Sequence, residues 1–256
     1  MNTAALARSR VAPVLLGIGT LAAFIALMQV LVVTGILNRF IVPPPSEVAL
    51  AFERVIVEEQ IFERFLLTMR ECVSAAALLA VFGISIGTLL YKVNILRQAT
   101  ETWVAAAAAA PTVLMYPLFM VIFGRSATTI IMMGFVAGLP AVILKTIEGL
   151  SSTKRVLMNV GRSFKLTPWQ MFWKIQFPSA LPTIFTGFKL GLIFALINVV
   201  GVEFLINFGG LGQLINDLAE RYDLAGTYAA ICFVILVSVC FFVVVERIER
   251  WLTRAA

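Results

Sequence analysis

Few side chains in this sequence could carry out covalent chemistry. The chain of 256 residues contains no histidine, which excludes His-based catalytic triads and His-ligated metal sites. Its three cysteines, Cys72, Cys232 and Cys240, lie in or beside apolar runs, and their odd number argues against a disulfide framework or a metal site. The GxxxxGK[ST] and HExxH patterns are also absent. The sequence therefore indicates no enzyme site and no nucleotide cradle of its own.

The segment 151–182 has a different chemistry, that of a surface which another protein could bind. It is the longest polar interruption in the second half of the chain, and it carries five basic residues and no acidic one. The apolar spacing predicts a first short helix over about 153–164, with Val156, Leu157, Val160 and Phe164 on one face. An exposed apolar face of this kind usually marks an interface.

A second short helix is predicted to start directly after the first. Thr167 is the expected N-cap, Pro168 the first helical residue and Gln170 the N3 partner of a capping box. Its apolar face begins at Trp169, and Pro178 is expected to end it. The residues Lys165, Leu166 and Thr167 then form the hinge between the two helices.

The composition places these elements in a membrane. Hydrophobic residues make up 61% of the chain and charged residues 13%, and the mean hydropathy is +0.98. Soluble domains are near half apolar and a quarter charged. We therefore predict an all-α, polytopic membrane helix bundle that forms a single domain over residues 1–256. The net charge of +6 is attributed to the positive-inside bias and not to nucleic-acid binding.

Six apolar segments are long enough to cross a bilayer. They are Val14–Leu37, Phe65–Leu90, Trp103–Phe123, Thr128–Ile147, Thr183–Ile206 and Thr227–Val245. The first is too long for the core of a signal peptide and is interpreted as a retained span. With the N-terminus inside, twelve basic residues, among them Arg8 and Arg10, fall in inner segments and five in outer segments. Both termini and the segment 151–182 are therefore expected in the cytoplasm.

The outer segment 43–64 is predicted to contain an amphipathic helix and not a plain spacer. Three prolines, Pro43 to Pro45, stop the first span, and Ser46 is the expected N-cap with Glu47 in the first turn. The spacing of Val48, Phe52 and Val55 gives the helix an apolar face. The helix is expected on the outer surface of the membrane or packed on the bundle.

The third span is predicted to be broken, because Pro111 and Pro117 each remove a helix hydrogen bond. Two interpretations stay open: a helix lining a translocation path with Met115 and Tyr116 near it, or a packing kink. Glu203 in the fifth span has two interpretations as well, local pairing within the bundle or part of an outer gate. Gly209, Gly210 and Gly212 predict a tight outer turn just beyond it.

Three GxxxG spacings fall within predicted spans. They start at Gly83, Gly134 and Gly187, in the second, fourth and fifth spans. Such spacings let helix backbones approach closely. They predict tight helix packing without naming the partners.

The 151–182 segment resembles the cytoplasmic EAA loop of permease subunits in binding-protein-dependent ABC importers. The family pattern is Glu-Ala-Ala, three residues, Gly, nine residues, Ile-x-Leu-Pro, and Ile175-Gln176-Phe177-Pro178 resembles its end. Counting back places Lys165 at the family glycine and Asn159-Val160-Gly161 at Glu-Ala-Ala. These positions depart from the pattern, whereas the spacing, the double proline and the two-helix character are kept.

Further stretches carry the resemblance along nearly the whole chain. They are Val42-Pro-Pro-Pro-Ser-Glu-Val48, Thr68-Met-Arg70, Gly83-Ile-Ser-Ile-Gly87, Pro111 with Pro117-Leu118, Phe123-Gly124, and Glu203 followed by Gly210-Leu-Gly212. In this order they are similar to the nitrate, sulfonate and taurine branch, which includes bicarbonate and thiamine-precursor permeases.

This resemblance implies a permease that is not itself an enzyme and binds no cofactor. Two copies, expected to form a homodimer, would form the pore in the lipid of a bacterial inner membrane. Two ATPase subunits would bind ATP and Mg in the cytoplasm, and a periplasmic or lipid-anchored binding protein would deliver a small anionic or organic substrate. The coupling residues implied are those from Asn159 to Gly161 with Arg162, Phe164, the hinge and Trp169. The candidates for the path or gate are Pro111, Met115, Tyr116, Asn198 and Glu203.

Two rival functions predict different observations. A self-sufficient secondary transporter or channel would work without an ATPase and would usually show internal repeats, and no convincing repeat relates the two halves of this chain. A purely structural membrane scaffold would leave the broken third span and the basic hairpin unexplained. Retention of a soluble ATPase by the purified chain would separate these alternatives.

Overall fold

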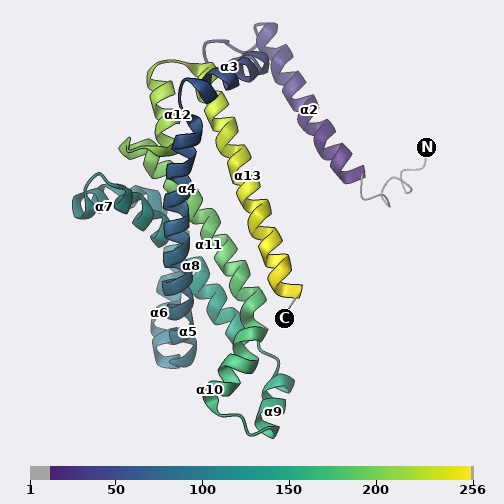
Figure 1. The fold of residues 1–256 in the computed structure, drawn as a ribbon, viewed down its shortest axis with the longest axis vertical. Helices are drawn as coiled ribbons and strands as arrows, with labels where there is room; N and C mark the ends of the chain where they lie inside the picture. The colour runs from purple at the N-terminus through teal and green to yellow at the C-terminus, as the bar shows by residue number, and fades with distance from the viewer. Residues whose placement is uncertain (1–11, 255–256) are drawn as a thin grey trace. The chain divides into compact units, whose positions relative to one another are not determined.

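The computed structural model describes residues 12–254, which form helices and short connections without a strand in this range (Figure 1). These residues divide into two compact units. The first unit combines the chain up to Ile61 with residues 217–233, and the second combines residues 62–216 with the chain from Val234 onward. Arg8 and Arg10, which contribute to the expected orientation, lie outside the described residues.

The first unit contains α2 (Ala12–Val33) and the predicted amphipathic helix, α3 (Pro45–Val57). The helix is confirmed, but its expected N-cap is wrong. Pro44 occupies the cap position with an extended backbone, and Pro45 is the first helical residue. Ser46 cannot serve as the cap, because its backbone N–H donates to Oε1 of Gln29 and its hydroxyl accepts from Nε2 of Gln29, each at 3.1 Å.

The second unit is built around α8 (Ala127–Ser151). On one side α8 contacts α11 (Phe177–Ile206), and on another it contacts the run formed by α4 (Ile61–Leu78), η1 (Leu79–Gly83) and α5 (Ile84–Lys92) (Figure 1). The short π-helix η1 keeps this run continuous over 32 residues. α8 is therefore the central helix of this unit.

Small residues set the distances between α8 and its neighbouring helices. The structure also shows which helices pack at the GxxxG spacings. A β-carbon on Gly138 would overlap the carbonyl oxygen of Gly191, and a β-carbon on Gly191 would lie 3.0 Å from the carbonyl oxygen of Gly138. A β-carbon on Gly87 would lie 2.6 Å from Cβ of Thr146. Backbones can approach this closely only where the side chain is a hydrogen atom.

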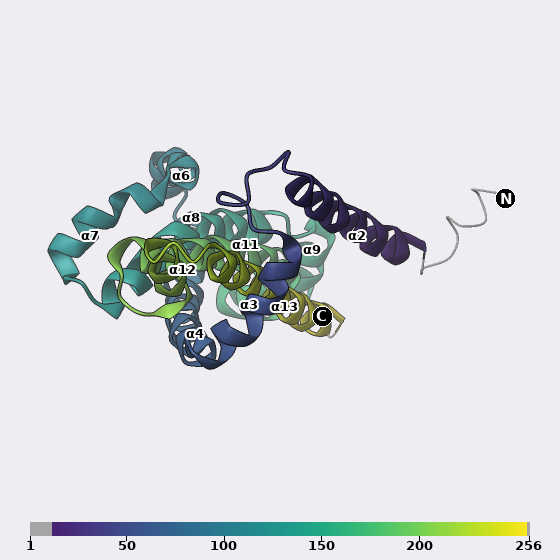
Figure 2. The same ribbon diagram turned by 90° about the horizontal axis from the view of Figure 1, so that it is seen from above.

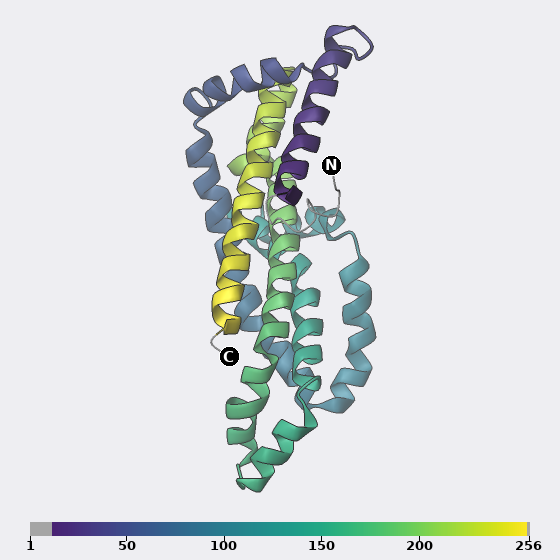
Figure 3. The same ribbon diagram turned by 90° about the vertical axis from the view of Figure 1, so that its right-hand side faces the viewer.

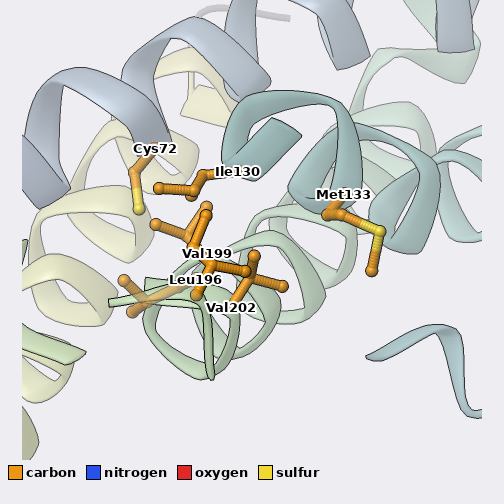
Figure 4. Packing of buried hydrophobic residues seen from close by; sticks show 7 residues of the cluster. Cys72, Ile130, Met133, Leu196, Val199 and Val202 are labelled. Atoms are coloured by element: carbon orange, nitrogen blue, oxygen red, sulfur yellow. The ribbon is translucent and has the colours of Figure 1, made fainter. Parts of the chain in front are cut away.

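Apolar side chains fill the space between these helices. One cluster joins α4 and α8 to α11 through Cys72, Ile130, Met133, Leu196, Val199 and Val202 (Figure 4). Cys72 is a buried free thiol in this cluster. This packing fixes α11, from which the candidates Asn198 and Glu203 project.

The predicted break in the third span is present and separates two helices that meet at a sharp angle. α6 (Asn94–Ala109) and the pair η2 (Thr112–Met115) and α7 (Tyr116–Phe123) meet at a bend of 94°. Ahead of Pro111, Ala110 takes an extended conformation, as residues before proline do, and this ends α6. Pro117 does not break a helix, since it lies in the first turn of α7. In Figure 2 the segment of α6 and α7 lies to one side of α8 and α11, and α7 keeps contact with α8 and packs Phe119 and Met120 against the apolar cluster.

The predicted basic hairpin is present as α9 (Arg155–Ser163) and α10 (Pro168–Met171). Figure 3 shows it as two short green helices at the lower end of α11. The expected end at Pro178 is wrong, because α10 continues through η3 (Phe172–Gln176) into α11. η3 is a π-helix, and Phe177 N–H bonds back five residues to the carbonyl of Phe172. Pro178 and Pro182 are accommodated in the helix that follows this widened turn.

Beyond α11 the chain turns through Gly209 and Gly210, both with positive φ, into α12 (Gly210–Glu220) and then α13 (Leu224–Arg254). Five helices of the described chain are long and apolar enough to cross a membrane, and the count becomes six if the bent pair forms one crossing. The all-α, multi-pass fold predicted from the sequence is confirmed in these terms.

Candidate coupling hairpin and translocation path

The turn of the hairpin is a Schellman motif with an unusual residue at its centre. Leu166 N–H donates to the carbonyl of Gly161 at 3.1 Å, and Lys165 N–H donates to the carbonyl of Arg162 at 2.9 Å. Lys165 has a φ of +53° at the position where glycine is usual. This is the position that the resemblance aligns with the family glycine. The left-handed hinge geometry is therefore present although the glycine is not.

The second helix starts as the sequence predicts. Thr167 Oγ1 accepts from Gln170 N–H at 3.3 Å, and Gln170 Oε1 accepts from Thr167 N–H at 3.0 Å, which completes the capping box. The two helices meet at Gly161, which is buried. A β-carbon there would lie 2.6 Å from Met171 Sδ and from Ile175 Cδ1. Gly161 is thus the contact point that closes the hairpin.

The hairpin exposes a row of large apolar side chains. Phe164 and Trp169, on either side of the hinge, are 76% and 66% exposed, and Val156 and Val160 on α9 are exposed as well. Leaving such surface in water is unfavourable by about 25 cal/mol per Å². Arg162 and the neighbouring basic residues are also exposed, so that the face combines apolar and positive groups. Such a face is suited to a groove on another protein.

The hairpin is also fastened to the end of α5, which the sequence did not reveal. Lys92 Nζ lies 4.3 Å from the ring centroid of Phe172 and 5.9 Å from that of Trp169. Gln176 Nε2 donates to the hydroxyl of Tyr91 at 3.0 Å. Tyr91 and Lys92 therefore connect α10 and η3 to the long run 61–92. Both contacts join residues about 80 positions apart, which no local pattern in the sequence records.

The break in the third span borders a cavity of about 330 Å³. Its lining includes Pro111, Thr112 and Asn198, together with small residues from α6 and apolar ones from α11. Thr112 Oγ1 donates to Asn198 Oδ1 at 3.0 Å, and Asn198 Nδ2 donates to the carbonyl of Phe194 at 3.0 Å. The lining contains no charged side chain.

The other two path candidates from this segment do not line that cavity. Met115 is exposed, and Tyr116 packs against the apolar cluster of α4, α8 and α11. Tyr116 also lines a separate hollow of about 630 Å³ with Pro117, Arg125 and Asn207. Pro111 and Asn198 are therefore brought together, while Met115 and Tyr116 lie beyond the bend.

Glu203 is fully buried and accepts hydrogen bonds from two other elements. Thr68 Oγ1 donates to Glu203 Oε1 at 2.7 Å, and Gly212 N–H donates to Glu203 Oε2 at 2.8 Å. Gly212 lies in the first turn of α12, where backbone N–H groups lack helical partners and favour a negative charge. Of the two interpretations of Glu203, local pairing within the bundle is the one that involves hydrogen bonds of this kind. Thr68 Oγ1 in turn accepts from Leu211 N–H at 2.9 Å.

Glu71 belongs to the same buried cluster, since it interacts with Glu203, and it is 6% exposed. The sequence predicted neither the Thr68 contact nor this one. The residues are separated by more than 130 positions along the chain, so only the packing of α4 on α11 brings them together.

The comparisons with known proteins agree with this geometry. Residues 80–254 match the family described as "binding-protein-dependent transport system inner membrane component". The chain is 26% identical over 215 residues to the riboflavin transport system permease protein of Chloroflexus aurantiacus, covering 84% of this chain and 80% of the relative. It is 22% identical to the taurine transport system permease protein of Escherichia coli, covering 94% and 89%.

Solved structures share the fold. An inward-facing methionine ABC transporter chain matches with a TM-score of 0.66 at 20% identity, over 75% of this chain and 96% of that chain. An amino acid ABC transporter chain matches with a TM-score of 0.64 at 13% identity, over 80% and 97%. The family match, the permease relatives and the shared fold give one conclusion: this chain belongs to the binding-protein-dependent transport inner membrane components and is the permease subunit of an ABC importer.

Proposed function

We propose that residues 1–256 form one permease domain that works as a pair of copies, a homodimer, in a bacterial inner membrane. Two separate ATPase subunits bind ATP and Mg and dock on the hairpin, and a soluble or lipid-anchored binding protein delivers the substrate from the other side. Both termini and the hairpin lie in the cytoplasm. The exposed apolar face around Phe164 and Trp169 is the observation that carries the coupling part of this proposal.

In this proposal the hairpin residues from Asn159 to Gly161, Arg162 and Phe164, the hinge 165–167 and Trp169 form the ATPase contact. ATP-driven movement of the ATPases displaces the hairpin, and the displacement reaches the helix bundle because α10, η3 and α11 are one continuous helical run. A rigid helix transmits such a displacement better than a flexible loop would.

The translocation path passes the break in the third span, at Pro111 and Asn198, with Met115 and Tyr116 beyond the bend. The uncharged lining of the cavity at the break supports a small organic substrate over a bare inorganic anion, which would lose hydration there without a cationic partner. Glu203 holds the start of α12 in place beside this path. Mass spectrometry of the ligand carried by the binding protein tests the substrate class, and nitrate as that ligand would contradict it.

Phe164→Asp tests the coupling contact directly. The substitution places an unpaired charge in a desolvated groove at an effective cost of several kcal/mol. The permease should insert and dimerise normally but lose its ATPase, or keep it without substrate-stimulated hydrolysis. Co-purification and ATP turnover in nanodiscs measure both effects.

Arg162→Ala is the matched control, because a charge at the rim of an interface mainly tunes association rates and the loss should be small. If Phe164→Asp binds the ATPase normally and transports at the wild-type rate, the hairpin is not the coupling site.

A pair of reporter fusions tests the orientation. A reporter active only in the cytoplasm should work when fused after Gly161 and fail when fused after Gln213. The opposite pattern would exclude a cytoplasmic hairpin.

A further inference from the structure

The turn between α12 and α13, residues 221–223, repeats the backbone of the hairpin turn. Asp223 N–H donates to the carbonyl of Leu218 and Tyr222 N–H donates to the carbonyl of Ala219, both at 3.0 Å. This is a second Schellman motif, and Tyr222 occupies its left-handed position with a φ of +58°. Glycine is favoured there because a β-carbon crowds the neighbouring carbonyl.

The ring of Tyr222 lies largely in solvent, so little packing energy offsets the cost of this backbone conformation. Its side chain is 89% exposed. Residues held in a sparsely populated conformation cluster at binding and functional sites. A large aromatic side chain that is both strained and almost fully exposed is therefore a candidate contact residue, since Tyr is enriched among the residues that dominate binding energies.

Both neighbours of Tyr222 form ion pairs with α3 or with the residues just beyond its end. Arg221 Nη1 lies 2.7 Å from Glu59 Oε1, just beyond α3, and Asp223 Oδ2 lies 2.5 Å from Arg54 Nη2. The second oxygen of Asp223 accepts from Gly226 N–H at 3.0 Å and caps the start of α13. The turn is thus held on either side of Tyr222, and the backbone that carries the ring is ordered before any partner arrives, which lowers the entropy lost on binding.

The surroundings of the ring in this unit are acidic. Residues 39–60 and 220–223 together contain six carboxylates and three guanidinium groups, and the guanidinium groups pair with Glu47, Glu59 and Asp223. Glu53 and Glu58, on α3 and at its end, are exposed. A surface of this kind favours a partner with a basic rim, because complementary charges steer association.

We propose that Tyr222, framed by the acidic groups of α3 and of the 221–223 turn, is an anchor for the soluble substrate-binding protein, whose contacting rim is basic. This inference rests on the proposed function and its orientation, in which the connection between the last two spans lies opposite the hairpin. The occupant follows from that placement and from the negative charge. A membrane surface rich in anionic lipid would be repelled.

The test compares Tyr222→Gly with Gln60→Gly. Gln60 is exposed, belongs to the same unit and has a φ of +51°, so glycine relieves the same backbone strain there without removing a ring. Binding to permease–ATPase nanodiscs is measured for the binding protein that co-purifies with the wild-type permease. We expect both variants to melt at a higher temperature than wild type, and only Tyr222→Gly to bind the binding protein about tenfold more weakly.

Salt gives a second readout. The association rate of the binding protein should fall as ionic strength rises, and a Glu53→Gln, Glu58→Gln double variant should weaken that dependence. Wild-type affinity of Tyr222→Gly would overturn the proposal. An affinity loss that appears in nanodiscs and disappears in detergent would overturn it too, because the ring would then contact lipid.

Direct binding separates this proposal from the proposed function. If wild-type complexes fail to couple ATP hydrolysis to uptake but still lose the binding protein on Tyr222→Gly, the coupling scheme fails and the anchor stands. If coupling is normal and Tyr222→Gly binds as wild type does, only the anchor is wrong.

Discussion

Two turns of this permease have the same backbone and use it differently. The 164–167 turn of the hairpin and the 221–223 turn between α12 and α13 both place a non-glycine residue, Lys165 and Tyr222, in the left-handed position of a Schellman motif. The hairpin turn is stabilised by the capping box and by apolar packing at Gly161. The other turn is stabilised by two ion pairs, one to α3 and one to Glu59 just beyond it.

The two kinds of stabilisation, apolar packing and ion pairs, lead each turn to expose a different surface. Packing at Gly161 turns the basic and aromatic faces of two helices outward, and the exposed face they form is broad. Ion pairs on either side of Tyr222 hold a short turn and present a single ring. A broad apolar face suits a lasting complex with an ATPase, and a single aromatic anchor among charges suits a partner that binds and leaves.

Among the substitutions in these two turns, Gly161→Leu should have the largest effect, on the packing of the hairpin and on ATPase binding. Its side chain would enter the space held by Met171 and Ile175, and overpacking of this kind costs about 1–3 kcal/mol. The two helices should separate, so protease cleavage within 155–170 and loss of ATPase binding are the expected readouts. Gly161→Ala is the control and should be milder, since the nearest atoms are the flexible ends of side chains. Equal behaviour of wild type and Gly161→Leu would show that the helices do not pack there.

Asp223→Ala should be the strongest change at the other turn. It removes the partner of Arg54 and the cap on Gly226 N–H, and loss of an N-cap costs about 1 kcal/mol. The melting temperature of the purified permease should fall. Arg221→Ala should cost less, because its side chain is more than half exposed and exposed ion pairs contribute little. A larger loss from Arg221→Ala than from Asp223→Ala would contradict this ranking.

Lys165→Gly should act in the opposite direction. Glycine at a left-handed position removes the crowding of the β-carbon and should stabilise the hairpin by up to about 1 kcal/mol. ATPase binding and transport should fall little, because Lys165 is an exposed charge at the rim of the proposed ATPase contact and rim charges mainly tune association rates. Thermal melting and uptake measured on the same preparation give both numbers. A large drop in transport with raised stability would show that the Lys165 side chain contributes more to the proposed ATPase contact than a rim charge does.

Lys92→Ala should have the smallest effect. The contact of its ammonium group with Phe172 contributes roughly 0.5–1 kcal/mol where solvent is near. Substrate-stimulated ATP hydrolysis should fall by a few-fold at most while ATPase binding is retained. Lys92→Arg keeps the charge over the ring and should behave as wild type. Full activity of Lys92→Ala would show that α5 does not help to position the hairpin.

Local sequence signals predicted the parts of this structure that depend on neighbours in the chain. Thr167, Pro168 and Gln170 define the start of α10 because a capping box needs only four consecutive residues. The prediction that the second short helix ends at Pro178 was wrong because the π-turn before this proline accommodates it in the helix. The sequence gives no signal of that π-turn. In the same way Ser46 satisfies the rules for an N-cap, but its groups bond to Gln29 instead.

Local sequence signals could not predict contacts between residues that lie far apart in the chain. The sequence marked Glu203 as unusual but not its partners Thr68 and Glu71, because these depend on how α4 and α11 pack. The break at Pro111 was predicted, yet the 94° bend depends on the path of α7 as well as on the proline. The contact of Lys92 with Phe172 joins residues 80 positions apart and depends on how the end of α5 lies against η3.

Uptake by reconstituted vesicles tests the central claim most directly. The permease is incorporated alone, with the ATPase subunit, and with the ATPase and the binding protein on opposite sides. The account predicts substrate accumulation only in the last case and only with ATP on the side of the hairpin, and it predicts that Phe164→Asp abolishes this accumulation. Uptake by the permease alone, driven by an ion gradient without ATP, would contradict the account and would identify a self-sufficient transporter.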